Sequence, residues 1–179
     1  MLHTLVLHVE DKPGVLTRVA SLFRRLNINI VSLTVGLSER AGISRFTLVC
    51  DASPEASNRI RASLFKLDNV LDVDDIAGAP TVTRELALIK IAATKDTRSA
   101  IFELAEVFRA RIVDLTAESL MIEMTGVESK IEGLVQVLED SDFQILEISR
   151  SGKMSMRRGH HTSRVLNAMS PTGEAPATQ

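Results

Sequence analysis

The chain has 179 residues, of which 45% are hydrophobic and 25% charged, and its formal net charge at pH 7 is -2. This composition predicts an ordinary globular protein with one large or two small domains. It argues against nucleic-acid binding, because recognition of the phosphate backbone requires a basic surface and single-strand recognition requires aromatic platforms, whereas six phenylalanines are the only aromatic residues.

Secreted, zinc-cluster and membrane proteins are disfavoured as well. The single cysteine, Cys50, excludes an internal disulfide and a cysteine-based zinc cluster, and its apolar neighbours favour a buried packing residue over a reactive thiol. His8, Glu10, Asp11 and Lys12 interrupt the N-terminal apolar run, so it does not resemble a signal peptide, and no run reaches membrane-spanning length. We expect a cytoplasmic protein that binds no membrane.

The first half of the chain alternates strand and helix patterns in the order βαββαβ. Strands are expected at residues 2–9, 28–35, 44–50 and 70–76, and helices at 13–26 and 54–66. The first helix has the spacing of an amphipathic helix packed on a sheet, with an apolar stripe of Leu16, Val19, Ala20 and Phe23, broadened by Val15, Leu22 and Leu26.

The second half repeats this order. Strands are expected at 85–92, 111–116, 119–125 and 143–148, and helices at 97–108 and 128–138. Ile30–Thr34 recurs 82 positions later as Ile112–Thr116, and Leu22–Arg24 is answered by Val107–Arg109. The fold class predicted is therefore α+β, with two tandem ferredoxin-like βαββαβ units.

Glycine, proline and the loss of hydrophobic periodicity mark the domain boundaries. We expect a first domain at residues 1–78, a linker at 79–83 and a second domain at 84–156. Residues 157–179 are expected to be a disordered tail, because their polar, proline-containing sequence shows no periodic apolar pattern. Arg157-Arg158 is too short a basic cluster to indicate anything but solvation.

The turn at Glu10–Leu16 carries the main functional signal. Pro13 is expected in the first helical turn, where its missing N–H costs nothing, and Gly14 leaves neighbouring N–H groups uncovered by a side chain. Free N–H groups at the positive end of a helix dipole favour a carboxylate or phosphate. The alternative is that the Pro-Gly pair is only a turn that starts a helix.

Catalytic and metal-binding patterns are missing from the sequence. Four histidines, His3, His8, His160 and His161, stand apart from any nucleophile pattern, so no catalytic residue is assigned. The tail pair His160-His161 is either a weak metal site or, more commonly, a solvated pair. Asp72, Asp74 and Asp75 alternate with apolar residues, which favours the outer face of an edge strand over a divalent-ion site.

With Glu10–Leu16 opening a helix and Asn27–Val35 forming the next strand, the first half resembles the ACT domain, a βαββαβ module that binds amino acids. The likeness extends to three further segments, Ser44–Thr47, Ile112–Thr116 and Ile148–Gly152. Over residues 1–158 the chain is similar to the small regulatory subunits of acetolactate synthase, also called acetohydroxyacid synthase.

This resemblance implies a non-catalytic protein that activates a large catalytic subunit and makes it sensitive to feedback inhibition by valine or another branched-chain amino acid. No cofactor is expected in this chain, and thiamine diphosphate, flavin and magnesium would belong to the catalytic partner. A homodimer or higher homo-oligomer is implied, because ACT units join edge to edge and thereby cover exposed strand edges.

The resemblance also assigns effector-binding residues. Gly14 and Val15 would offer backbone N–H groups to the effector carboxylate, and Asn29, with Ile30 beside it, would bind across a subunit interface. Asp11 would face the ammonium group or, alternatively, cap the helix; many relatives carry asparagine there. The second unit lacks both proline and glycine in its corresponding turn, residues 92–98, so we assign it to assembly and partner contact.

Two other functions stay open. The chain could be a free-standing amino-acid sensor, made of paired ACT units, that acts on another enzyme or a transporter. It could also be an enzyme with unrecognised chemistry on a ferredoxin-like fold, against which the shortage of candidate acids, bases and nucleophiles argues.

Overall fold

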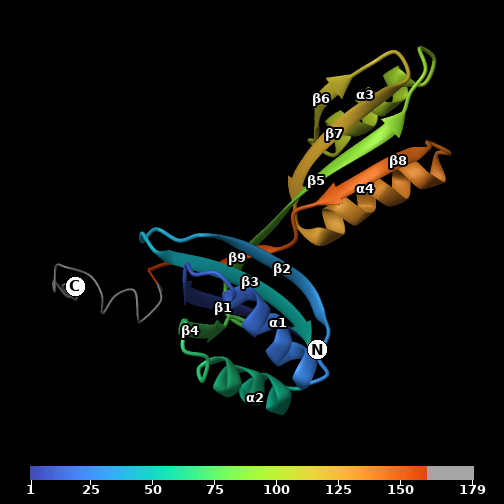
Figure 1. Ribbon diagram of the computed structural model, residues 1–179. Coiled ribbons are helices and arrows are strands. Elements are labelled where there is room, and N and C mark those ends of the chain that lie inside the picture. Colours follow the sequence, from blue (N-terminus) through green and yellow to red (C-terminus); the bar gives the residue numbers. More distant parts are fainter. Residues whose placement is uncertain (161–179) are drawn as a thin grey trace, which may run out of the picture. The chain divides into compact units, whose positions relative to one another are not determined.

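The computed structural model describes residues 1–160 and divides them into two compact units (Figure 1). The first unit comprises residues 1–82 together with the described residues from 155 onward, and the second comprises residues 83–154. Of the predicted tail, the part from His161 onward lies outside the described residues. Within residues 1–160, no helix is long and apolar enough to cross a membrane.

The first unit has the predicted βαββαβ order. Its elements are β1 (Leu2–Glu10), α1 (Val15–Arg25), β2 (Ile30–Leu37), β3 (Ile43–Asp51), α2 (Pro54–Leu64) and β4 (Val70–Asp75). The strands form an antiparallel sheet in the order β2-β3-β1-β4, and both helices pack on one of its faces (Figure 1). We call the opposite face of each sheet its outer face.

The second unit repeats the arrangement. It contains β5 (Thr81–Ala92), α3 (Arg98–Val107), β6 (Arg111–Leu115), β7 (Ser119–Gly126), α4 (Glu128–Asp140) and β8 (Ile145–Arg150), with strand order β6-β7-β5-β8. The prediction of two tandem ferredoxin-like units is therefore confirmed. One further strand, β9 (Met154–Arg157), pairs with β5 and is not among the predicted elements.

The first halves of the two units share one hydrogen-bond register. The N–H of Glu10 donates to the Asn69 carbonyl at 2.9 Å, and the N–H of Ala92, 82 positions later, donates to the Gln144 carbonyl at the same distance. Asn27 and Arg109, also 82 apart, both end a helix in the left-handed conformation, at φ 53° and φ 52°. The spacing of 82 predicted from Ile30–Thr34 is thus the structural one for the first strand, the first helix and the second strand of each unit.

The shorter sequence likeness between Leu22–Arg24 and Val107–Arg109 does not align structurally equivalent residues, because these segments are 85 rather than 82 positions apart. Phe23 and Ala105, 82 residues apart, receive equivalent helix-terminal bonds, from the N–H groups of Ile28 and Ala110. A match of three residues lacks the information to fix an alignment, whereas hydrogen bonds at both helix ends fix it.

Each unit has its own hydrophobic core between helices and sheet. In α1, Val15, Val19, Leu22 and Phe23 are buried, whereas Leu16 and Ala20, which were predicted to face inward, are exposed. The buried face of α1 is therefore rotated away from the predicted one, toward the side that carries Val15 and Leu22. Cys50 is fully buried in the first core, and burial raises the pKa of its thiol to about 11, with the charges of Asp75 and Asp51 adding to the effect.

Strand β9 is anchored to the outer face of the first sheet. Arg157 forms a bidentate ion pair with Asp74, at 2.7 and 2.8 Å, and Arg45 donates from Nη2 to the Ser155 carbonyl at 2.5 Å. The interpretation of Arg157 as a merely solvated residue is therefore wrong. Its partner lies 83 positions away in the sequence, too far for any local pattern to indicate the contact.

Candidate functional site

The Pro-Gly turn precedes α1 rather than forming its first turn. The helix begins at Val15, and Gly14 is the N-cap with φ 84° and ψ -7°. The Val15 N–H lies 3.4 Å from the Lys12 carbonyl oxygen. With Pro13 and Gly14 as the two central residues, this contact and these angles define a type II turn. The prediction that the helix starts at Pro13 is wrong by two residues, because proline suits the second position of such a turn as well as the first turn of a helix.

Glycine is required at position 14 by backbone conformation. A φ of +84° strains any residue with a Cβ, although a Cβ built there would meet no atom within 4 Å. Residues 11 to 14 are all exposed, so this turn presents its backbone to solvent at the N-terminus of α1. A small anion reaching it would meet the positive end of the helix dipole.

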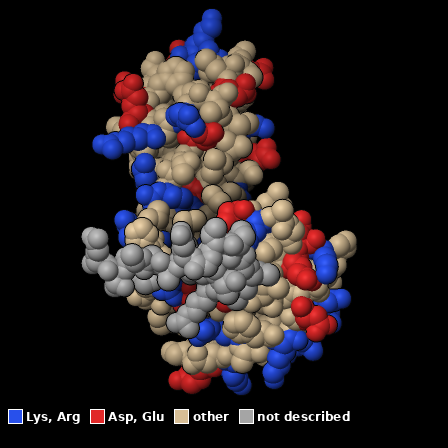
Figure 2. Space-filling view, turned by 90° about the vertical axis from the view of Figure 1, so that its left-hand side faces the viewer, with Lys and Arg blue, Asp and Glu red and all other residues tan. Residues whose placement is uncertain are grey.

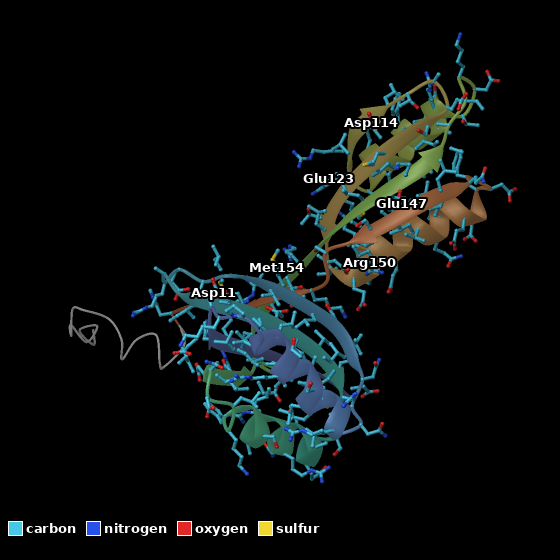
Figure 3. The ribbon with its side chains drawn as sticks, viewed as in Figure 1. Asp11, Asp114, Glu123, Glu147, Arg150 and Met154 are labelled. Carbon is cyan, nitrogen blue, oxygen red and sulfur yellow. The ribbon has the colours of Figure 1, made fainter. Side chains whose placement is uncertain are left out.

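Asp11 lies beside this turn at the end of β1 (Figure 3). Its N–H donates to the Gly42 carbonyl at 2.8 Å, and its carboxylate accepts a hydrogen bond from the Ser44 hydroxyl at 3.1 Å. No side chain caps α1, so the alternative that Asp11 is the helix cap is wrong. The Ser44 bond fixes an exposed carboxylate next to the turn, where it can meet a cationic group of a ligand.

Neighbouring side chains hold the end of β1 in place. Glu10 accepts from the Asn69 amide at 2.6 Å and from Lys12 at 2.9 Å, and these two hydrogen bonds, that of Lys12 foremost, lower the pKa of its carboxyl. Arg18 donates to the Asn69 side chain at 2.6 Å, which connects the first turns of α1 to the loop before β4. The turn is thus supported from two sides.

Asn29 and Ile30 lie at the other end of α1. Asn29 is exposed and directly precedes β2, and Ile30 opens that strand opposite Cys50. Since α1 has 11 residues, the helix rise separates Asn29 from Gly14 by roughly 16 Å or more along the axis. One chain therefore brings together Asp11, Gly14 and Val15, but it does not bring Asn29 and Ile30 to them.

Strand β2 is an edge of its sheet and carries exposed apolar side chains. Val31 and Val35 are each almost half exposed, and Leu37 is 79% exposed. Leu16, on the neighbouring helix α1, is 45% exposed. An apolar edge strand of this kind is suited to pairing with another chain.

The acidic run on β4 divides between the two faces of the sheet. Asp74 and Asp72 stand opposite Val6 and His8 on the outer face, as predicted for an edge strand. Asp75 is the exception, because it accepts hydrogen bonds from Ser57 on α2, at 2.6 Å, and from His3, at 2.7 Å. Among residues 1–160 no group of three or more metal-ligating side chains is close enough to hold a metal ion.

In the second unit the equivalent turn has different chemistry. Asp96 stands 82 positions after Gly14, and the cap of α3 is Thr97 with φ -92°, so no residue from 94 to 97 adopts a positive φ. A carboxylate in this position repels the anion that a bare helix N-terminus would attract. The two turns are therefore chemically distinct despite their common register.

Comparison with known proteins gives one consistent result. The family described as small subunit of acetolactate synthase matches residues 84–159, and the AHAS small subunit-like ACT domain matches residues 5–72. The acetolactate synthase small subunit of Mycolicibacterium smegmatis is 46% identical over 157 residues, covering 88% of this chain and 91% of that protein.

Two further relatives are more distant. The probable acetolactate synthase small subunit of Archaeoglobus fulgidus is 42% identical over 160 residues, which cover 89% of this chain and 99% of that protein. The crystal structure of the acetolactate synthase small subunit from Thermotoga maritima superimposes with a TM-score of 0.82 at 36% identity, covering 90% of this chain and 99% of that one.

Proposed function

Because this chain belongs to the family of acetolactate synthase small subunits, and is thus a regulatory subunit of that enzyme, we propose that it binds valine or another branched-chain amino acid at the Asp11–Val15 turn. The bound effector would inhibit the catalytic subunit. The observation that carries the proposal is the exposed turn at Gly14, which presents the N-terminus of α1 beside a fixed carboxylate.

The chemistry of the turn suits a zwitterion. The effector carboxylate would lie against the backbone of Gly14 and Val15 at the positive end of the α1 dipole. Its ammonium group would face the carboxylate of Asp11, which Ser44 orients. An apolar effector side chain requires apolar surface nearby, and half-exposed Leu16 on α1 supplies some.

A second copy of the chain would complete the site. Asn29 and Gly14 lie too far apart in one chain for a single amino acid to bridge them. A two-fold axis beside β2 and α1 would bring Asn29 and Ile30 of one copy to the Gly14 turn of the other and would cover the exposed Val31 and Val35. We therefore propose a homodimer with the effector at its interface.

The catalytic chemistry belongs to the partner in this proposal. Thiamine diphosphate, flavin and magnesium would be held by the large subunit, and this chain would change the partner's activity through contact alone.

Acidic and basic side chains are interspersed on the face seen in Figure 2, without the continuous basic patch that a nucleic-acid partner would need.

Calorimetry combined with sedimentation tests the proposal. Valine titrated into the purified chain should bind, and the chain should sediment as a dimer or larger at the same concentration. A monomer that still binds valine tightly would refute the shared site. A dimer that binds no branched-chain amino acid would refute the assignment of an effector.

A further inference from the structure

Strand β9 is fastened to the first sheet at two points. Arg45 on β3 donates from Nη2 to the Ser155 carbonyl of β9 at 2.5 Å, and Arg157 on β9 forms its bidentate ion pair with Asp74 on β4. Ser155 is only 4% exposed. Because β1 lies between β3 and β4 in the sheet, β9 crosses β1.

His8 is the titratable side chain of β1 at this crossing. It stands between Arg45 of β3 and Asp72 of β4, and Asp74 stands opposite Val6, two residues earlier. His8 is only 6% exposed, and its Nδ1 is buried with no hydrogen-bond partner among residues 1–160. Buried polar atoms without a partner are rare in folded proteins, because leaving one unpaired costs free energy.

A proton on His8 is disfavoured in this position. An imidazolium carries a proton on both ring nitrogens, so Nδ1 would become a buried donor without an acceptor. Burial, and after it the charge of Arg45, lower the pKa of His8, whereas the carboxylates of Asp72, Glu39 and Asp74 oppose this with smaller individual effects. The ring is therefore neutral at pH 7 while β9 is in place.

The groups that hold β9 are also the groups that act on His8. Arg45, which binds the Ser155 carbonyl, would be repelled by an imidazolium beside it. Asp74, which would attract the proton, is already engaged in the bidentate pair with Arg157. Release of β9 would expose the ring to water and free Asp74, and both changes favour the protonated form.

We propose that β9 is a proton-sensitive latch, closed over neutral His8 and released when His8 is protonated. In the released state the ring has its ordinary pKa of about 6.5, above the lowered value of the closed state. Closure is therefore fully favoured above about pH 6.5 and weakens as the pH falls below it. If the closed ring stays neutral, the opening equilibrium should rise about tenfold between about pH 7.5 and 5.5.

The consequence concerns the end of the chain. Residues 151–153 connect β8 of the second unit to β9, so an open latch would free from the first sheet the segment that follows β8. The ordinary pKa values of aspartate and glutamate, about 3.9 and 4.3, lie below the range in which the latch responds. The latch does not depend on the assignment of the effector.

Hydrogen exchange of the full-length chain tests the proposal. The Arg158 N–H, directly after β9, donates to the Pro80 carbonyl at 2.9 Å and reports closure. The Ile28 N–H, which donates to the Phe23 carbonyl at 3.1 Å, is the reference in the same unit. After correction for intrinsic exchange, the opening constant at Arg158 should be about tenfold higher at about pH 5.5 than at about pH 7.5, and that at Ile28 should change less than about twofold. Equal opening constants of Arg158 at the two pH values would overturn the proposal.

A His8→Gln variant identifies the titrating group. Glutamine keeps a polar side chain that does not titrate in this range, so a variant with a wild-type circular dichroism spectrum should lose the pH dependence at Arg158. A pH dependence of wild-type size in His8→Gln would overturn the proposal, because another group, such as His160, would then be its source.

The ring of His8 gives a measurement that leaves this residue unchanged. Its titration, followed by NMR, should have a midpoint below the ordinary value in the wild-type chain. The midpoint should rise in Arg157→Ala, which breaks the pair with Asp74, but not in Arg158→Ala, which removes the same charge one residue further on. A midpoint unchanged by Arg157→Ala, or raised equally by both substitutions, would overturn the proposal. Failure of the chain to bind valine would leave all of these measurements unaffected.

Discussion

Replacing Gly14 with aspartate should separate effector binding from folding. The left-handed backbone at φ 84° costs about 1–2 kcal/mol for a residue with a Cβ, and a carboxylate at the helix N-terminus returns about 0.3–1 kcal/mol. No atom lies within 4 Å of the added Cβ, so no steric term is added. We therefore expect a net loss of about 1 kcal/mol in the free energy of unfolding, which leaves the fold intact.

The effect on the effector should be larger. The new carboxylate would stand where the valine carboxylate is expected, and charge-assisted hydrogen bonds of this kind are worth about 1.5–3 kcal/mol each. The valine dissociation constant should rise by roughly 10- to 150-fold, measured by calorimetry and by the midpoint of inhibition in the reconstituted enzyme.

Gly78→Asp is the matched control for this variant. Gly78 has φ 77° and no atom within 4 Å of an added Cβ, so it reproduces the strain and the charge away from the turn. It should keep wild-type valine sensitivity. If Gly14→Asp also kept full inhibition at an unchanged midpoint, the turn would not be the effector site. If Gly14→Asp instead lost both activation of the catalytic subunit and dimerisation, Gly14 would be a purely structural residue.

Three further variants probe the interface, the buried network and β9. Asn29→Ala should weaken valine binding in calorimetry less than Gly14→Asp does, since it removes polar contacts without adding charge, and unchanged binding would exclude Asn29 from the site. Burial opposes ionisation of Asp75, but hydrogen bonds from Ser57, the Ala77 N–H and His3 outweigh it and lower its pKa. The stabilisation is therefore full above the unfolded-state pKa of about 3.9 and is lost as the pH falls through the lower folded-state value. In urea unfolding, Asp75→Asn should cost about 1–3 kcal/mol at pH 7 and progressively less towards pH 3, and a pH-independent difference would refute this cause. Arg157→Ala should lower the free energy of unfolding by about 1 kcal/mol by breaking the bidentate pair, whereas its neighbour Arg158→Ala should be nearly neutral, and equal effects would contradict the anchoring of β9.

The fold could be predicted because each element carries its own periodic signal. The stripe containing Val19 and Phe23, and the 82-residue repeat from Ile30 to Ile112, are local patterns that the hydrophobic effect translates directly into helices and sheets. Strand β9 carries no such signal, because it is held by pairing with β5 and by contacts with Arg45 and Asp74, the latter 83 positions before Arg157. Long-range ion pairs of this kind are invisible to sequence periodicity.

For the candidate turn, the sequence indicates the residue types but not their geometry. A Pro-Gly pair fits both a type II turn and a first helical turn, so the sequence alone could not exclude Pro13 as the helix start. Likewise, strand alternation predicted an outward Asp74 but could not indicate that the adjacent Asp75 turns inward to meet Ser57. The residue types of a site are local properties, whereas their partners depend on the assembled sheet.

The rate of acetolactate formation by the purified catalytic subunit tests the central claim most directly. It should be measured with and without this chain, each with and without valine. Regulation through this chain predicts that its addition raises the rate and that valine lowers the rate only when the chain is present. Valine inhibition of equal extent with and without the chain, or a raised rate that valine leaves unchanged, would contradict it.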